Sequence, residues 1–344
     1  MSLIKIQGIP VYKPAQGFKY PWAIQAWEEH DAMVWHKSEY TLSKDTQDYA
    51  KASEKEKEDI TKIMRLFVQN DVQAGIGYVT MLRIFKPVEI QLMLSKFNAR
   101  EGTHVYNYAN FIDTIGLPSD IYTQFLDIPV MATKSEYIDK AKVKKYEDYK
   151  AMGMSDVQVD KEFRKAVARM TGIYAGGLEG VALMAQFAML LNFQFQGKYP
   201  GLCTIVKWSV RDEAAHVQYN SKLFRTFIEE KPDIWDDALK FDIYEAMREI
   251  VAYEHALIDY INPDHMSNES LKRYVEFMAD NALNGLGLKR NWNTTVNPLP
   301  YMDDALAITK TDFFSGTVSE YTKSVQGTWE EVDYSKWKDV NYEI

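Results

Sequence analysis

The sequence predicts an all-α protein built as a bundle of long helices. Apolar residues recur at helical spacing over long stretches, and no alternating strand pattern bounded by hairpin turns interrupts them. Apolar residues make up 46% of the 344 residues and charged residues 26%, which is a normal balance for a globular protein with a sizeable core. One large helical domain is therefore expected.

Prolines and glycines mark the order of the helices. The first twenty residues hold Pro10, Pro14 and Gly17, so we expect them to be irregular. Pro87 separates two long periodic stretches, since proline fits the first turn of a helix but not its interior. Gly116 ends the second of these stretches. The expected helices cover residues 22–36, 51–85, 88–115, a shorter pair within 120–150, then 159–195, 202–229, 233–260 and 266–290.

The helical period is lost after Asn291. Residues 296–344 hold further prolines and glycines, with scattered aromatic side chains and little sustained period. We therefore expect three parts along the chain: an irregular N-terminal segment (1–20), a helical domain (21–292) and a flexible C-terminal tail (293–344).

Charge and composition exclude several classes of protein. The net charge is -9 and no run of lysine and arginine occurs, so direct binding to nucleic acid is not expected. The single cysteine, Cys203, rules out an internal disulfide framework and fits a reduced, cytoplasmic setting. No uninterrupted apolar run of about 18 residues and no signal-like start is found, so we expect no membrane span.

Two of the six histidines have a glutamate three residues before them. The pairs are Glu101 with His104 and Glu213 with His216, and each pair falls within a long predicted helix. Residues three apart share a helix face, so each pair can hold one metal ion. A single such pair is unremarkable, because a lone glutamate is commonly a solvated charge and a lone histidine a core residue.

An acidic residue on the preceding helix accompanies each pair. Asp71 lies 30 residues before Glu101, and Glu179 lies 34 before Glu213, both among apolar neighbours. Two antiparallel helix pairs would bring all six side chains to one depth of a four-helix bundle. One carboxylate from each of two helices and Glu-x-x-His from each of the others is the ferritin-like di-iron or di-manganese pattern. Asn70 adjoins Asp71, but only the aspartate supplies a charge.

The chain resembles a known family at these positions. The segments 99–108, Ala-Arg-Glu-Gly-Thr-His-Val-Tyr-Asn-Tyr, and 209–216, Ser-Val-Arg-Asp-Glu-Ala-Ala-His, are similar to the ligand helices of class I ribonucleotide reductase small subunits. The resemblance runs from about Trp35 to Tyr321. It implies a homodimer that uses O₂ and a metal pair to oxidise a tyrosine. The radical then passes to a large subunit that reduces ribonucleotides to deoxyribonucleotides.

The resemblance assigns the radical to Tyr108. This residue lies four after His104 and seven after Glu101, on the same helix face, whereas Tyr106 points elsewhere. A core tyrosine anchored by its hydroxyl is the alternative. Family position also implies that Asp212 orients the first ligand histidine and links it to Trp35, for which plain core packing is the alternative.

The tail and the tyrosine pocket carry further implications. Tyr321 matches the tyrosine that relays the radical at the subunit interface, with Tyr334 and Tyr342 as rival candidates, and the tail would dock on the large subunit.

Ser209 is a departure from the family, because a large aliphatic side chain is usual there. Its polarity puts the dryness of the pocket in question. The other pocket positions are Leu183 and Phe187.

Oxygen and imidazole ligands without thiolate suit iron or manganese, and we expect iron first, with O₂ needed for activation.

Two other functions share some of these features. Another ferritin-like di-metal oxidase acting on a small or lipid substrate would keep the six ligands, but it would need a substrate channel and no tail. An iron-storage or purely structural bundle is disfavoured by the length of the chain and its aromatic tail.

Overall fold

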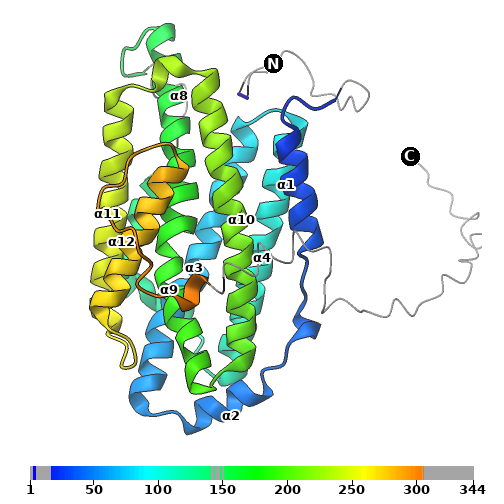
Figure 1. Ribbon diagram of the computed structural model, residues 1–344, viewed down its shortest axis with the longest axis vertical. Coiled ribbons are helices and arrows are strands. Elements are labelled where there is room, and N and C mark those ends of the chain that lie inside the picture. The colour runs from blue at the N-terminus through cyan, green and yellow to red at the C-terminus, as the bar shows by residue number, and fades with distance from the viewer. Residues whose placement is uncertain are drawn as a thin grey trace, which may run out of the picture.

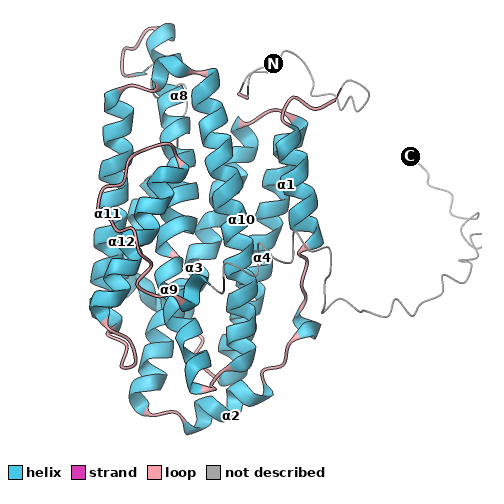
Figure 2. Cartoon of the chain, in the orientation of Figure 1, coloured by secondary structure: helices cyan, strands magenta, loops and turns pink. Residues whose placement is uncertain are grey.

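The predicted all-helical fold is confirmed. The computed structural model describes residues 3–4, 17–140, 143, 148, 151–303 and 305. Throughout these ranges the regular structure is helical and contains no strand (Figure 2). The long helices run side by side along the long axis of the molecule (Figure 1). This is the layered helix-on-helix arrangement in which each helix buries an apolar stripe.

The described helices follow closely the order expected from the sequence. In chain order they are α1 (Pro21–Ala32), η2 (Lys37–Glu39), α2 (Ser43–Lys51), α3 (Glu54–Ile84), α4 (Val88–Ile115), α5 (Ile121–Gln124), η3 (Phe125–Asp127), α6 (Pro129–Lys140), α8 (Asp156–Gly172), η4 (Ile173–Ala182), α9 (Met184–Leu191), η5 (Asn192–Gln196), α10 (Pro200–Glu230), η6 (Pro232–Ile234), α11 (Asp237–Ile261) and α12 (Asn268–Gly285).

Local sequence sets the ends of the two longest N-terminal helices. The Ser53 hydroxyl accepts a hydrogen bond from the backbone N–H of Glu56 and so caps the start of α3. Pro87 stands immediately before α4, where its missing N–H is harmless. Gly116 ends α4 in a left-handed conformation with φ of 80°, which glycine adopts without strain. The predicted boundaries of α4 therefore agree with the observed ones.

Four helices form the centre of the bundle. Helix α3 packs along α4, and η4 packs against α10. Helices α11 and α12 cover the other side of η4, while α1 lies against α4 at the opposite edge of the molecule (Figure 1). Every residue of η4 is buried, so this segment lies in the interior. The site described below sits among α3, α4, η4 and α10.

The stretch expected as one helix over 159–195 is divided into segments. Residues Ile173–Ala182 form a π-helix between α8 and α9. At Gly177 in this segment, a Cβ atom would come within 2.3 Å of the terminal methyl group of Ile250 on α11, so the two helices approach each other closely there. This segment contains Glu179, and wide helical turns of this kind are frequent at functional sites. Helical period alone cannot distinguish such a turn from an α-helical one.

The run Asp156–Gln196 is long and apolar enough, by composition alone, to cross a membrane. Its most apolar window is entirely buried by the surrounding helices. That burial is what a central helix of a bundle requires, because it is apolar on every side.

Candidate metal centre

Six buried side chains from four helices converge inside the bundle. Helix α3 supplies an aspartate and η4 a glutamate, while α4 and α10 each supply a glutamate and a histidine three residues apart. None of the six is more than 2% exposed. They are Asp71, Glu101, His104, Glu179, Glu213 and His216.

These side chains form two overlapping candidate metal sites. In each group the potential ligand atoms lie within 4.8 Å of one another. Glu101 and Glu213 belong to both groups, so two ions held there would share these two carboxylates. The first group adds Asp71 and His104, and the second adds Glu179 and His216.

Both histidines turn the same ring nitrogen toward the carboxylates. The Nδ1 atom of His104 lies 3.1 Å from a carboxylate oxygen of Glu213 and 3.6 Å from one of Glu101. The Nδ1 atom of His216 lies 3.0 Å from Glu101 and 3.2 Å from Glu213. In each ring the Nε2 atom faces away from the cluster and meets another side chain.

The polar atoms of this cluster fit bound cations. Both oxygens of Asp71 are buried without a hydrogen-bond partner among the described residues, and the oxygens of Glu101 and Nδ1 of His104 meet other members of the cluster. Burial raises the pKa of Asp71 and of Glu179 well above the ordinary carboxyl value, and the charges of Glu101 and Glu213 raise it further, although the neighbouring histidines oppose this shift. Four carboxylates would neutralise two divalent ions, and a donor set of oxygen and imidazole suits iron or manganese.

The register around Asp71 is also clear from the packing. The side chain of Asn70 donates a 2.8 Å hydrogen bond to Gln186 and so faces a different neighbour. Asp71 is the member of this pair that joins the acidic cluster.

Tyr108 lies buried on α4, one turn beyond His104. Its hydroxyl donates a 2.7 Å hydrogen bond to Ser209 on α10, and its ring meets the ring of Phe67 edge-on at 4.6 Å. Phe187 packs against Phe67, with ring centroids 5.2 Å apart. Tyr106, in contrast, is 58% exposed.

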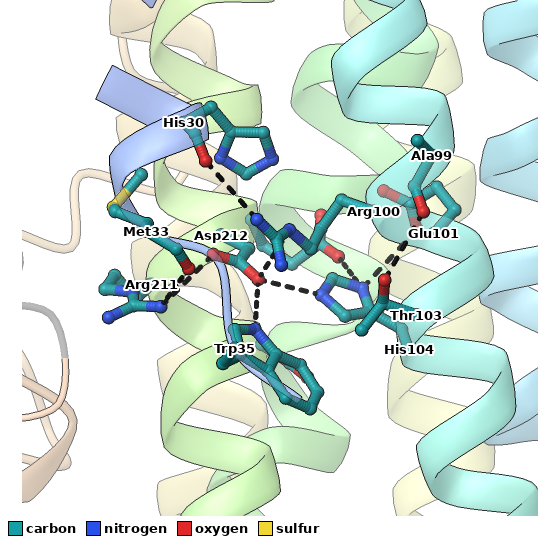
Figure 3. Close-up of polar contacts among 12 residues, drawn as sticks. His30, Met33, Trp35, Ala99, Arg100, Glu101, Thr103, His104, Arg211 and Asp212 are labelled. Atoms are coloured by element: carbon teal, nitrogen blue, oxygen red, sulfur yellow. Dashed lines mark hydrogen bonds and ion pairs between the residues drawn. The ribbon is translucent and has the colours of Figure 1, made fainter. Parts of the chain in front are cut away.

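Asp212 connects the cluster to Trp35 (Figure 3). Its Oδ2 atom accepts a 2.7 Å hydrogen bond from the indole N–H of Trp35 and lies 3.3 Å from Nε2 of His104. Arg100 lies 3.3 Å from the same oxygen. Burial opposes the charge of Asp212, but the hydrogen bond with His104 and the Arg100 guanidinium hold its pKa well below the usual range.

The comparisons with known proteins agree with this geometry. Residues 15–298 match the family described as ribonucleotide reductase, small chain. The chain belongs to this family. Among relatives of this small chain is the probable ribonucleoside-diphosphate reductase small subunit 376L of Invertebrate iridescent virus 6, which is 32% identical and covers 96% of this chain and 99% of its own. The ribonucleoside-diphosphate reductase subunit beta of Chlamydia pneumoniae is 22% identical, and the match covers 90% of each chain.

Solved structures confirm the fold of this small chain. The R2 subunit of ribonucleotide reductase from Clostridium botulinum has a TM-score of 0.75 at 19% identity, over 89% of this chain and 94% of its own. The dimanganese(II) protein NrdF of Streptococcus sanguinis has a TM-score of 0.68 at 18% identity, and the match covers 86% of this chain and 100% of its own. An R2-like ligand-binding oxidase with a Mn/Fe cofactor has a TM-score of 0.63 at 16% identity, and the match covers 82% of this chain and 99% of its own. Likeness at this identity concerns the fold alone, and family membership favours the reductase over the oxidase and storage alternatives.

Sequence reasoning missed three buried residues of this small chain. His30 on α1 lies with its Nε2 atom 3.1 Å from Nε2 of His216. Arg100 joins Asp212, and Tyr78 on α3 accepts a 2.8 Å hydrogen bond from Asn220. No short-range pattern marks His30 or Arg100, since their partners come from other helices. Tyr78 follows Asp71 by seven residues, as Tyr108 follows Glu101, and this spacing is the one sequence signal for it.

One expectation about this small chain differs from what the structure describes, and one falls on residues that the structure does not describe. Helix α1 ends at Ala32, so Trp35 lies beyond it rather than in a helix over 22–36. Two arginine side chains donate hydrogen bonds to backbone carbonyl groups at the end of this helix. Arg100 donates to the carbonyl of His30 at 3.3 Å, and Arg211 donates to the carbonyl of Met33 at 2.8 Å. The tail tyrosines lie outside the described residues; they are Tyr321, Tyr334 and Tyr342.

Proposed function

We propose that this ribonucleotide reductase small chain holds two metal ions in the buried cluster and generates a radical on Tyr108. The radical is then passed to the large subunit, where ribonucleotides are reduced. The observation that carries the proposal is the convergence of the six side chains with Tyr108 and Asp212 beside them.

The two overlapping groups assign ligands to two ions. Asp71 and His104 would serve one ion, Glu179 and His216 the other, and the shared glutamates Glu101 and Glu213 would contact both. Iron is the first choice for this donor set, and manganese is the alternative. Bound ions together with O₂ would supply the oxidising power that removes an electron from a tyrosine.

The surroundings of Tyr108 suit a side chain that is oxidised and then protected. Its ring lies among buried aromatic side chains that keep water away. Its hydroxyl donates to Ser209 Oγ at 2.7 Å. If oxidation removes both the electron and the hydroxyl proton of Tyr108 toward the cluster, the Ser209 hydroxyl can turn and donate to the phenoxyl oxygen. The pocket is therefore dry but not wholly apolar. Ser209 is the residue that distinguishes this pocket from one lined only by aliphatic and aromatic side chains.

The hydrogen bonds of Asp212 offer a connection from the cluster toward the surface. Asp212 holds the Nε2 side of His104 and the indole N–H of Trp35, and both contacts are buried. Trp35 borders a cavity of about 770 Å³ that also reaches the exposed ring of Tyr106. We assign Asp212 and Trp35 to the transfer of the radical out of this chain.

Partners and location complete the proposal. Family membership implies work with a large subunit, and we assign its docking to the tail, residues 293–344, with Tyr321 as the relay tyrosine.

We propose a homodimer through an apolar stripe on α3, where Val72, Ile76 and Val79 are 38%, 44% and 40% exposed. A buried free cysteine, Cys203, fits the cytoplasm.

Radical spectroscopy on variants of two tyrosines tests the central proposal. Metal-free protein is loaded with iron or manganese, exposed to O₂ and examined by electron paramagnetic resonance (EPR). We expect a tyrosyl signal in the wild type and in the exposed control Tyr106→Phe, and none in Tyr108→Phe. Metal content should be two ions per chain in all three. A tyrosyl signal that persists in Tyr108→Phe would overturn the assignment.

A further inference from the structure

The two candidate ligand histidines are held from behind by different groups. His104 turns its Nε2 atom to the carboxylate of Asp212 at 3.3 Å. His216 turns its Nε2 atom to the Nε2 atom of a third histidine, His30, at 3.1 Å. Both contacts are fully buried. One half of the site therefore has an anionic partner and the other half an imidazole.

We propose that His30 is a positioning residue that fixes the tautomer and the ring orientation of His216, so that Nδ1 of His216 is presented to a metal ion. The inference rests on the proposed function, because it assigns a partner to one of the proposed ligands. A ligand histidine generally donates its second ring N–H to an acceptor, which sets the tautomer and orients the ring.

Counting protons assigns the direction of the contact. Two nitrogens 3.1 Å apart can share only one hydrogen between them, so one ring donates and the other accepts. Nδ1 of His216 must offer a lone pair to bind an ion, which places the proton of the neutral ring on Nε2. His216 therefore donates and Nε2 of His30 accepts. The proton of His30 then lies on its Nδ1, which has no hydrogen-bond partner among the described residues.

The surroundings of His30 hold its ring in place. Phe97 packs edge-on against it, with ring centroids 5.1 Å apart and an interplanar angle of 90°. The same phenyl ring lies 4.5 Å from the ring of His216, so one aromatic side chain supports both imidazoles. These contacts restrict rotation of His30 and keep its acceptor aimed at His216.

Arg100 links the two supporting groups to each other. Its Nε atom lies 3.3 Å from Asp212, and its Nη2 atom donates to the backbone carbonyl of His30 at 3.3 Å. A buried guanidinium thus fixes the acceptor behind His104 and the backbone that carries the acceptor behind His216 (Figure 3). The end of α1 is in this way tied to the site.

A metal titration of the full-length chain tests the inference without an activity measurement. Metal-free protein is titrated with Mn²⁺, and free Mn²⁺ is followed by EPR. We expect His30→Leu, which removes the acceptor, to weaken binding of one of the two ions by about 10- to 100-fold and to leave the other unchanged. His30→Gln should bind within a few-fold of the wild type, because its side-chain carbonyl can accept the same hydrogen bond.

Two further variants separate the possible failures. His216→Ala should lose one ion, whereas His255→Leu, a change on α11 away from the cluster, should lose none. The melting temperature of each metal-free variant reports folding. If His30→Leu binds both ions as the wild type does, or if His30→Gln is as weak as His30→Leu, the role of His30 is wrong while the proposed function stands. If His216→Ala also binds both ions normally, both proposals fail.

Discussion

Tyr108 and Ser209 share a 2.7 Å hydrogen bond between two fully buried side chains. The sequence suggested that a polar residue at position 209 would make the tyrosine pocket less dry. The hydroxyl of Ser209 is instead occupied by Tyr108, so its polarity is satisfied inside the protein.

Ser209→Ala tests the effect of this bond on the radical. In the wild type, we expect the tyrosyl radical to show coupling to an exchangeable proton, and this coupling should disappear when the protein is transferred to D₂O. In the variant, the coupling should be absent. Electron–nuclear double resonance measures it. The buried Tyr108 hydroxyl would also lose its partner, which lowers the free energy of unfolding by about 1–3 kcal/mol.

Ser221 provides the matched control for that change. Its hydroxyl is buried without a hydrogen-bond partner in the described structure, so Ser221→Ala should leave the radical spectrum unchanged and should not lower the stability. A proton coupling that survives in Ser209→Ala would show that another group is bonded to the radical.

Trp35→Phe removes the indole N–H that binds Asp212 at 2.7 Å. We expect turnover with the large subunit to fall at least about tenfold, equivalent to about 1.4 kcal/mol in the barrier. The content of metal and of tyrosyl radical should remain near the wild-type values. Trp27→Phe, on α1 and outside the hydrogen bonds of Asp212, is the control. Full turnover in Trp35→Phe would remove this residue from the transfer path.

The metal-free protein should lose stability as the pH rises. Burial alone would lower the pKa of His216, but the carboxylates of Glu213 and Glu101 raise it from 6.5 to about 10. The stability contributed by protonated His216 is therefore fully present below about pH 6.5 and lost as the pH rises through about 10. The raised pKa values of Asp71 and Glu179 act in the same direction.

Thermal unfolding of chelator-treated protein, followed by circular dichroism, measures this effect. The melting temperature should fall steadily between about pH 6.5 and about pH 10. His216→Gln should show a flatter profile over the same interval, because it lacks the titrating ring. An identical slope in the two proteins would contradict the assignment to His216.

The stripe on α3 predicts a defined effect on assembly. Its three residues recur at helical spacing, and Ile76→Glu places a charge at their centre. We expect this variant to sediment as a monomer in analytical ultracentrifugation while the wild type sediments as a dimer. Val157→Glu is the matched control, since Val157 is 80% exposed on α8. A dimeric Ile76→Glu protein would place the interface elsewhere.

Deletion of residues 322–344 tests the docking role of the tail. We expect activity with the large subunit to be lost, whereas metal content and the tyrosyl radical should be retained, because the proposed ligands lie well before the deletion. A synthetic peptide of the deleted sequence should inhibit the full-length pair by competition. Activity that survives truncation would contradict the tail assignment.

The sequence by itself determined the order of the long helices and identified the proposed ligands. Both depend on local geometry: a helix places residues three and four apart on one face, so Glu101 with His104 and Glu213 with His216 could be recognised as pairs. Burial of Asp71 and Glu179 followed from their apolar neighbours. The fold class and the family resemblance therefore follow from the sequence.

The tertiary structure decided which groups stand behind those ligands. His30 meets His216 across 186 residues, and Tyr108 meets Ser209 across 101. The π-helical segment around Glu179 packs closely against α11, where Ile250 lies beside Gly177. Such contacts are set by how separate helices pack, and helical periodicity identifies the buried face of a helix but not the residue on another helix that it meets.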